Sequence, residues 1–299
     1  MRELGFNTSL LHGVNNKNPE GATHPPIYQS SAFRFDQAED IEKVFTNKAM
    51  GFAYTRINNP TVEAFEQRVT YLEDGLASVA CASGIAAISS TILNILQSGD
   101  EIVAAAGLYG GTVELFDDFE LLGVHTRYVE VNEPEEYEKL INENTRIIFA
   151  ETIGNPKLDV TDIAAVAKIA HKHNIPLVID NTVATPYLVK PIQLGADIVI
   201  HSSSKYMNGS SNAISGVLTW SGKFKFDDKF PLMKNYRKFG NYGYIARLRN
   251  DLFRNLGGCL SPQNAFLNIL GLETLGLRME RQCSNALVLA KFLKGLEQL

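Results

Sequence analysis

Between residues 77 and 200, short apolar runs alternate with stretches whose apolar residues recur at helical spacing. Short runs that are apolar throughout are typical of strands buried on both faces, and an intervening helix brings the chain back to start a parallel neighbour. We therefore expect an α/β domain with a mostly parallel central sheet covered by helices on both faces. The expected strands are Ser78–Cys81, Ile102–Ala105, Thr126–Val131, Ile147–Ala150, Leu177–Ile179 and Ile198–Ile200, followed later by Val217–Trp220. The clearest expected helices are Ile85–Leu96, Thr112–Leu122 and Ile163–His173.

Polar side chains follow five of these runs, at the point where each strand is expected to end. They are Ser83-Gly84, Tyr109-Gly110, Glu151 with Asn155, Asp180-Asn181 and Ser202–Lys205. Ligands bind at the carboxyl edge of open parallel sheets, so we expect these groups to meet around one site. Gly84 also opens a helix, where free backbone N–H groups could receive a phosphate. The two common glycine-rich nucleotide motifs are absent, which argues against a nucleotide.

The segment Asp197–Gly209 places Lys205 just beyond a buried strand and directly after Ser202, Ser203 and Ser204. Partial burial favours a neutral amine, which could form a Schiff base with a carbonyl cofactor. The neighbouring hydroxyls could hold a phosphate. Asp180 ends the strand before. An amine, an acid and a phosphate-binding patch at neighbouring strand ends together indicate pyridoxal phosphate.

The first 50 residues are rich in Gly, Asn and Pro and predict an irregular, extended arm rather than a domain. Such an arm lies across a neighbouring subunit or is a flexible tail. Tyr54 and Arg56 follow it, before a helix expected to begin at Pro60-Thr61. The guanidinium of Arg56 and the phenol of Tyr54 suit a phosphate. The alternative is that both are surface residues that bind no ligand.

The composition excludes several classes of protein. The chain has 299 residues, a net charge of −5, 45% hydrophobic and 20% charged residues, as in soluble globular proteins. Mild acidity without a basic block argues against nucleic acid, and no apolar run is long enough to span a membrane. We expect a cytoplasmic protein. His171 and His173 point in different directions on a helix, so we expect no metal site.

Four motifs make this sequence similar to the cysteine and methionine metabolism family of pyridoxal phosphate enzymes. They are Y-T-R-I-N-N-P-T at Tyr54–Thr61, A-S-G-I-A-A-I at Ala82–Ile88, D-N-T-V-A-T-P at Asp180–Pro186 and H-S-S-S-K-Y at His201–Tyr206. The family includes O-acetylhomoserine sulfhydrylase, cystathionine γ-synthase, cystathionine γ-lyase and methionine γ-lyase. The segment Leu260–Arg281 is most similar to the sulfhydrylase branch. Ser204 stands where the family usually has Thr, and Y-M-N-G-S-S-N-A follows Lys205 where many relatives have G-H.

The resemblance implies an aspartate-aminotransferase-like fold of type I and a homotetramer, and it assigns roles by position. Lys205 matches the lysine that holds the cofactor and transfers protons, and Asp180 the acid that pairs with the pyridine nitrogen. Tyr109 matches the tyrosine that stacks on the ring and acts as an acid or base, and Asn155 a residue near the ring hydroxyl. Tyr54 and Arg56 match residues that reach the neighbouring subunit's phosphate. The matched phosphate contacts are Ser83, Gly84, Ile85, Ser202 and Ser204.

The implied reaction is γ-replacement on O-acetyl-L-homoserine by sulfide or a thiol, with γ-elimination from methionine or cystathionine, or cystathionine synthesis, as alternatives. An alternative of another class is a non-catalytic binding or assembly module. The expected parts are an arm at 1–50, a cofactor-binding large domain at 51–255, and at 256–299 a helical linker and the start of a small C-terminal domain, which is largely absent. In the family that domain carries the arginine for the substrate carboxylate, which we expect beyond residue 299.

Overall fold

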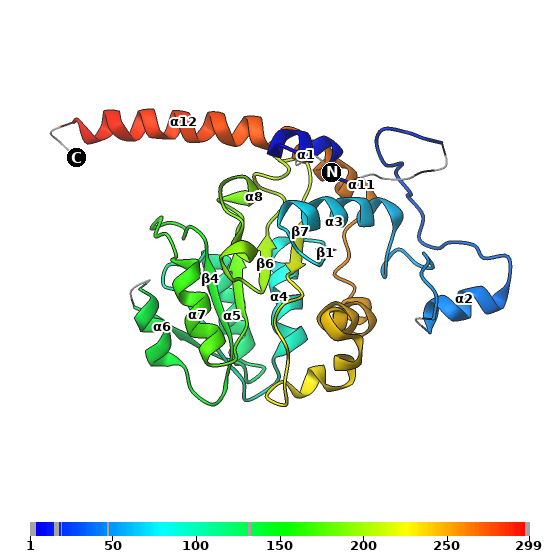
Figure 1. The fold of residues 1–299 in the computed structure, drawn as a ribbon, viewed down its shortest axis with the longest axis horizontal. Helices are drawn as coiled ribbons and strands as arrows, with labels where there is room; N and C mark the ends of the chain where they lie inside the picture. Colours follow the sequence, from blue (N-terminus) through cyan, green and yellow to red (C-terminus); the bar gives the residue numbers. More distant parts are fainter. Residues whose placement is uncertain (1–3, 15–17, 19, 47, 131–132, 297–299) are drawn as a thin grey trace.

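The computed structural model describes residues 4–14, 18, 20–46, 48–130 and 133–296. Its centre is a seven-stranded sheet in the order β1-β7-β6-β5-β4-β2-β3 (Figure 1). Strand β7 is antiparallel to β1 and β6, and all other neighbours are parallel. The strands are β1 (Ala77–Cys81), β2 (Glu101–Ala104), β3 (His125–Tyr128), β4 (Thr145–Glu151), β5 (Leu177–Asp180), β6 (Ile198–His201) and β7 (Gly216–Trp220).

Helices surround this sheet, and several begin where the sequence supplies a capping side chain. Asn59, Ser83, Asp162 and Ser261 each accept a backbone N–H in the first turn of the helix that follows. The α-helices are α1 (Phe6–His12), α2 (Ala38–Phe45), α3 (Pro60–Leu72), α4 (Gly84–Ile95), α5 (Gly110–Glu120), α6 (Pro134–Leu140), α7 (Ile163–Lys172), α8 (Thr185–Leu188), α9 (Gly243–Arg247), α10 (Arg254–Leu256), α11 (Pro262–Glu273) and α12 (Leu275–Lys294). Turns of other helical types are η1 (Pro191–Leu194), η2 (Pro231–Tyr242) and η3 (Leu248–Phe253).

Both faces of the sheet are buried, and the alternation of side chains along β1 shows how. Val79 and Cys81 belong to one hydrophobic cluster, which also contains residues of α4, whereas Ala80 belongs to a second cluster with α3 and α11. Helices therefore cover β1 on both sides, as the continuous apolar runs predict. The edge strand β3 is the exception, because its side chains are mostly exposed although we expected a buried strand.

Five of the strands meet at one edge of the sheet, and the segments next to them there carry the polar side chains. Parallel strands β2, β4, β5 and β6 end there, and antiparallel β7 begins there at Gly216. A Cβ on Gly216 would lie 2.1 Å from the carbonyl oxygen of Ser83, so only glycine allows β7 to start against the turn that precedes α4.

All seven expected strands and the three clearest helices occur, and most of their ends differ by at most two residues. Val131, the last residue of the third expected strand, lies outside the described residues. The arm was expected to be irregular, and this is wrong in part, because it contains α1 and α2. Leu10 of α1 is buried in the cluster with α3 and α11, whereas α2 buries no residue.

At the other end of the chain, α12 runs away from the body of the molecule (Figure 1), and every residue from Glu280 to Leu296 is exposed. Within the described part of the chain, no helix is long and apolar enough to cross a membrane. His171 and His173 contact different carboxylates, Asp197 at 2.9 Å and Glu138 at 3.1 Å.

Candidate active site

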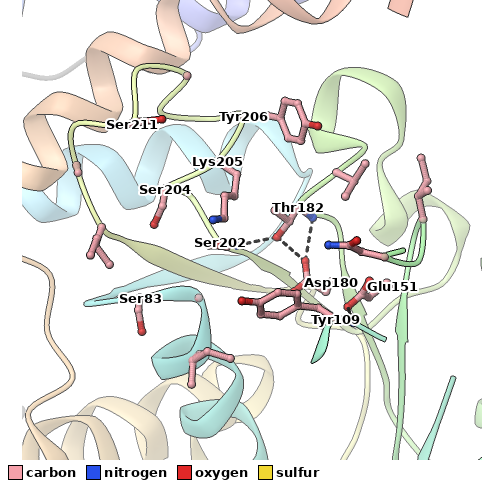
Figure 2. Close-up of a pocket in the computed structure, with 18 of the residues that line it drawn as sticks. Ser83, Tyr109, Glu151, Asp180, Thr182, Ser202, Ser204, Lys205, Tyr206 and Ser211 are labelled. Carbon is pink, nitrogen blue, oxygen red and sulfur yellow. Dashed lines mark hydrogen bonds between the residues drawn. The ribbon is translucent and has the colours of Figure 1, made fainter. Parts of the chain in front are cut away.

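The carboxyl edge of the sheet opens into a pocket of about 950 Å³ (Figure 2). Most of the lining residues come from segments that are far apart in the sequence and that end or follow β1, β2, β4, β5 and β6, and two come from α12. Nine of the residues expected to bind the cofactor line this pocket: Ser83, Gly84, Ile85, Tyr109, Asn155, Asp180, Ser202, Ser204 and Lys205.

Lys205 lies at the end of a tight turn that follows β6. Its backbone N–H donates to the carbonyl of Ser202 at 3.1 Å, and its own carbonyl accepts from Gly209 at 2.8 Å. We expected partial burial, but the side chain is exposed because it extends into the open pocket (Figure 2). The amine is therefore accessible to a ligand in the same space as Asp180.

Asp180 is the last residue of β5, and its carboxylate has one occupied and one open oxygen. Oδ1 accepts hydrogen bonds from Thr182, at 2.9 Å from the backbone N–H and at 2.5 Å from Oγ1. Oδ2 has no hydrogen-bond donor among the described residues. Burial raises the pKa of Asp180, and the bonds from Thr182 partly offset this effect.

Thr182 is a residue that the sequence did not single out. Besides donating to Asp180, its Oγ1 accepts the backbone N–H of Ser202 at 2.8 Å. One hydroxyl thus links the acid on β5 to the turn that carries Lys205. The signal in the sequence was the threonine two positions after Asp180, a spacing that favours a local side-chain hydrogen bond.

Asn181, expected at the site beside Asp180, points into the core instead, because successive side chains point to opposite faces. It donates to Glu73 Oε1 at 3.1 Å and accepts from the hydroxyl of Thr152 at 2.7 Å. Glu73 Oε1 also lies 2.6 Å from His201 Nε2, and both of these side chains are fully buried. These four buried polar side chains are therefore bonded to one another on the core side of the ends of β4, β5 and β6.

The start of α4 offers backbone donors to the pocket. Ser83 Oγ accepts the N–H of Ala86 at 3.0 Å, whereas the N–H groups of Gly84 and Ile85 have no acceptor within the helix. Ser202 lies against Gly84, and its hydroxyl makes no hydrogen bond within the described residues. Two free N–H groups, a free hydroxyl and the positive end of a helix form a site for an anion.

Two of the three consecutive hydroxyls hold the turn in place. Ser204 Oγ donates to the carbonyl of Ser215 at 2.9 Å and accepts its N–H at 2.8 Å. Ser203 is buried, and its hydroxyl donates to Ser215 Oγ at 2.8 Å. We expected all three hydroxyls to be available to a phosphate. In this structure only that of Ser202 is free, because Ser215, the residue before β7, engages the other two.

Arg278 of α12 also lines the pocket, and sequence reasoning missed it. Its guanidinium donates to the carbonyls of Tyr206 and Gly271, both at 2.7 Å, and to Thr274 Oγ1 at 3.0 Å. It therefore fastens the turn after Lys205 to α11 rather than presenting free donors. Carbonyl acceptors leave no mark in a sequence, so no motif indicated this contact.

Tyr54 and Arg56 do not line the pocket of their own chain. Both are exposed, and the Arg56 guanidinium carbon lies 5.3 Å from the centre of the Tyr54 ring. Arg56 Nη1 donates to the carbonyl of Arg254. Within one chain, these two residues belong to the surface beside the arm.

This geometry fits pyridoxal phosphate. The anion site at α4 suits the phosphate, because the glycine at position 84 lets Ser202 and its free hydroxyl lie against the free N–H groups at the start of the helix. The open oxygen of Asp180 suits the cationic ring nitrogen, and the accessible amine of Lys205 suits the aldehyde. Together, the fold and the site define a pyridoxal-phosphate enzyme of fold type I.

Comparisons with known proteins also indicate a pyridoxal-phosphate enzyme. A family model described as Cys/Met metabolism PLP-dependent enzyme matches residues 7–299, and the chain belongs to this family. O-acetyl-L-homoserine sulfhydrylase of Leptospira meyeri is 41% identical over 96% of this chain and 70% of its own length. L-methionine gamma-lyase of Treponema denticola is 38% identical over 98% of this chain and 69% of its own length.

A solved structure also resembles this chain throughout. It is a putative O-acetylhomoserine (thiol)-lyase of Campylobacter jejuni, which carries N'-pyridoxyl-lysine-5'-monophosphate. The TM-score is 0.92 at 32% identity, covering 99% of this chain and 76% of the other.

Proposed function

We propose that the chain catalyses γ-replacement on O-acetyl-L-homoserine. Sulfide or a thiol takes the place of the γ-acetoxy group, so a Cγ–S bond forms as the Cγ–O bond breaks, and the products are homocysteine or methionine and acetate. The observation that carries the proposal is that the Lys205 amine and the Asp180 carboxylate open into one pocket (Figure 2). The sulfhydrylase relatives from Leptospira meyeri and Corynebacterium glutamicum, 41% and 40% identical, support the choice of substrate.

Each residue has a task in this proposal. Bound pyridoxal phosphate supplies an electron sink that makes the substrate's α-proton acidic. Lys205 would hold the cofactor through its amine, and as a free amine it would take that proton. Asp180 would keep the ring nitrogen protonated, because a carboxylate and a cation in contact, about 3 Å apart at an effective dielectric of about 20, attract by about 5 kcal/mol before desolvation. Tyr109 would stack on the ring and would move a proton as acid or base.

The remaining contacts orient the cofactor. Gly84 and Ile85 hold the phosphate through their N–H groups, and Ser202 through its hydroxyl. Ser83 caps the helix that presents them, Ser204 fixes the turn, and Asn155 lies near the ring hydroxyl.

Tyr54 and Arg56 have a task only if a second copy is present. We propose that they reach the phosphate in the pocket of a neighbouring subunit within a homotetramer. Their exposure, next to the arm at residues 1–50, supports this assignment. In the same proposal, residues 51–255 form the cofactor-binding domain and residues 256–299 a helical linker into a small C-terminal domain.

The test is a substrate comparison on purified protein with pyridoxal phosphate bound. With O-acetylhomoserine and sulfide, we expect homocysteine and acetate in equal amounts. Lys205→Ala should abolish both the products and the visible absorption of the lysine-bound cofactor. A protein that stays colourless after incubation with the cofactor would instead be a non-catalytic binding or assembly module.

A second candidate is γ-elimination, because L-methionine gamma-lyases are 38% and 37% identical to this chain. It predicts 2-oxobutyrate and ammonia from methionine without a thiol acceptor. If that reaction has the higher kcat/KM, the sulfhydrylase proposal is wrong and the lyase assignment replaces it.

A further inference from the structure

Glu151 is a buried acid in the pocket to which the proposed reaction gives no role. It ends β4 and pairs in register with Asp180, which ends β5. Side chains at paired positions of parallel strands point to the same face, so both carboxyl groups face the pocket. Glu151 lines the pocket with only 7% of its surface exposed (Figure 2).

The carboxyl group of Glu151 joins two loops. Oε1 accepts the backbone N–H of Tyr109 at 2.7 Å, and the backbone N–H of Asn155 donates to the same carboxyl group. Tyr109 belongs to the loop between β2 and α5, and Asn155 to the loop after β4. Each loop brings one residue to the pocket, so this acid fixes the position of one loop relative to the other.

The ring of Tyr109 depends on its backbone for its position. Its side chain is 51% exposed and makes no hydrogen bond within the described residues. The ring lies against Gly111, where a Cβ would come within 2.7 Å of the ring atom Cε1. On the chain, the carbonyl of Tyr109 accepts from Thr112 of α5 at 2.8 Å. Without Glu151, the backbone N–H of Tyr109 loses its acceptor, and only the carbonyl of Tyr109 stays hydrogen-bonded.

We propose that Glu151 is the positioning residue for Tyr109 and holds its ring over the cofactor by accepting its backbone N–H. The inference depends on the role proposed above for Tyr109. Positioning needs an acceptor oxygen and not a charge. Burial, and then the neighbouring Asp180, raise the pKa of Glu151 to about 7, and a carboxyl oxygen accepts the N–H in either protonation state.

The test compares variants that keep or remove the acceptor, each loaded with pyridoxal phosphate. Glu151→Gln keeps an acceptor oxygen and should retain kcat within about 3-fold. Glu151→Ala removes it and should lower kcat by about 100-fold, because a misplacement of about 1 Å costs that much. The visible circular dichroism of the bound cofactor, which reports the ring beside it, should change in Glu151→Ala alone. Glu151→Leu, which fills the space without an acceptor, replaces the alanine variant if that one does not fold.

A double-mutant cycle separates positioning from a general structural effect. In a Tyr109→Ala background, Glu151→Ala should cause little further loss of kcat or change in the dichroism. Glu143→Ala, an exposed acid before the opposite end of β4, is the matched control and should leave both signals unchanged.

Two outcomes would overturn the inference: equal losses in the glutamine and alanine variants, or an undiminished loss in the Tyr109→Ala background. If the wild-type protein binds the cofactor but makes no homocysteine, the proposed function fails. The dichroism comparison still decides the role of Glu151 in that case, because it requires no turnover.

Discussion

Gly84 and Ser202 are in such close contact that a Cβ on residue 84 would lie 2.7 Å from the Cβ of Ser202 and 3.0 Å from its Oγ. This contact joins the start of α4 to the turn after β6. It therefore fixes the distance between two free N–H groups and one free hydroxyl. The anion site exists because position 84 has no side chain.

Gly84→Ala should weaken the binding of pyridoxal phosphate by at least about 10-fold, because the new methyl group pushes Ser202 away from the helix. Overpacking of this kind costs about 1–3 kcal/mol of stability as well. Fluorescence titration of the cofactor measures the first effect and urea unfolding the second. Gly110→Ala is the control, since a Cβ at the start of α5 would meet nothing within 4 Å. Equal affinities for the two variants would contradict the assignment of this site.

Thr182→Val should lower kcat by about 10-fold while leaving the fold intact. Valine has nearly the same shape but lacks the hydroxyl that donates to Asp180 and accepts from Ser202. The hydrogen bond from the Thr182 hydroxyl lowers the pKa of Asp180, so its loss, with the backbone N–H bond kept, raises that pKa and weakens the hold of Asp180 on a protonated ring nitrogen. Thr182→Ser keeps the hydroxyl and should restore most of the activity in steady-state kinetics. If serine is as poor as valine, the hydroxyl is not the reason for the loss.

Glu73→Ala should cost about 3–5 kcal/mol of the free energy of unfolding, because it leaves His201 buried without its partner. The chain contains a matched control. Glu120 and His125 form a pair at the same distance, 2.6 Å, but their side chains are 41% and 55% exposed. Glu120→Ala should therefore cost no more than about 1 kcal/mol in the same urea titration. Similar losses for the two variants would show that burial is not what makes the Glu73 pair important.

The sequence predicted the site better where function depends on a strand end than where it depends on a hydrogen-bond partner. Asp180 and Lys205 were predictable, because a buried apolar run shows where a strand stops. Asn181 was misplaced, although the alternation of side chains along a strand sends the residue after Asp180 to the opposite face and could have shown this. The contacts of Arg278 could not be predicted, because most of its partners are backbone carbonyls that only the fold brings together.

The arm at residues 1–50 is a second part of the fold whose structure was in part predicted wrongly. The helices α1 and α2 were missed, since turn formers dominate the composition around them. In α2, Glu39 and Asp40 lie in the first turn and Lys43 in the last, which favours a helix even though it buries nothing. Apolar residues also recur at helical spacing there, at Ala38, Ile41, Val44 and Phe45, so both the charge pattern and the apolar periodicity were available signals.

Glu151 also predicts how the stability of the cofactor-free protein depends on pH. Burial raises its pKa from the ordinary 4.5 to about 7, so the folded protein binds a proton that the unfolded chain releases. Stability from this group is therefore present below about pH 4.5 and is lost as the pH rises through 7. At 1.36 kcal/mol per pKa unit, the full loss is on the order of 3 kcal/mol.

Glu151→Gln removes this titration, so its unfolding free energy relative to the wild type should increase between pH 5 and pH 8. Urea unfolding at four pH values across this range measures the difference. Asp180 is present in both proteins, so its own raised pKa largely cancels in the comparison. Glu143→Gln, an exposed acid, should show a difference that does not vary with pH. A difference for Glu151→Gln that stays flat or shrinks toward pH 8 would mean that burial and the neighbouring Asp180 do not raise the pKa of Glu151 in the folded protein.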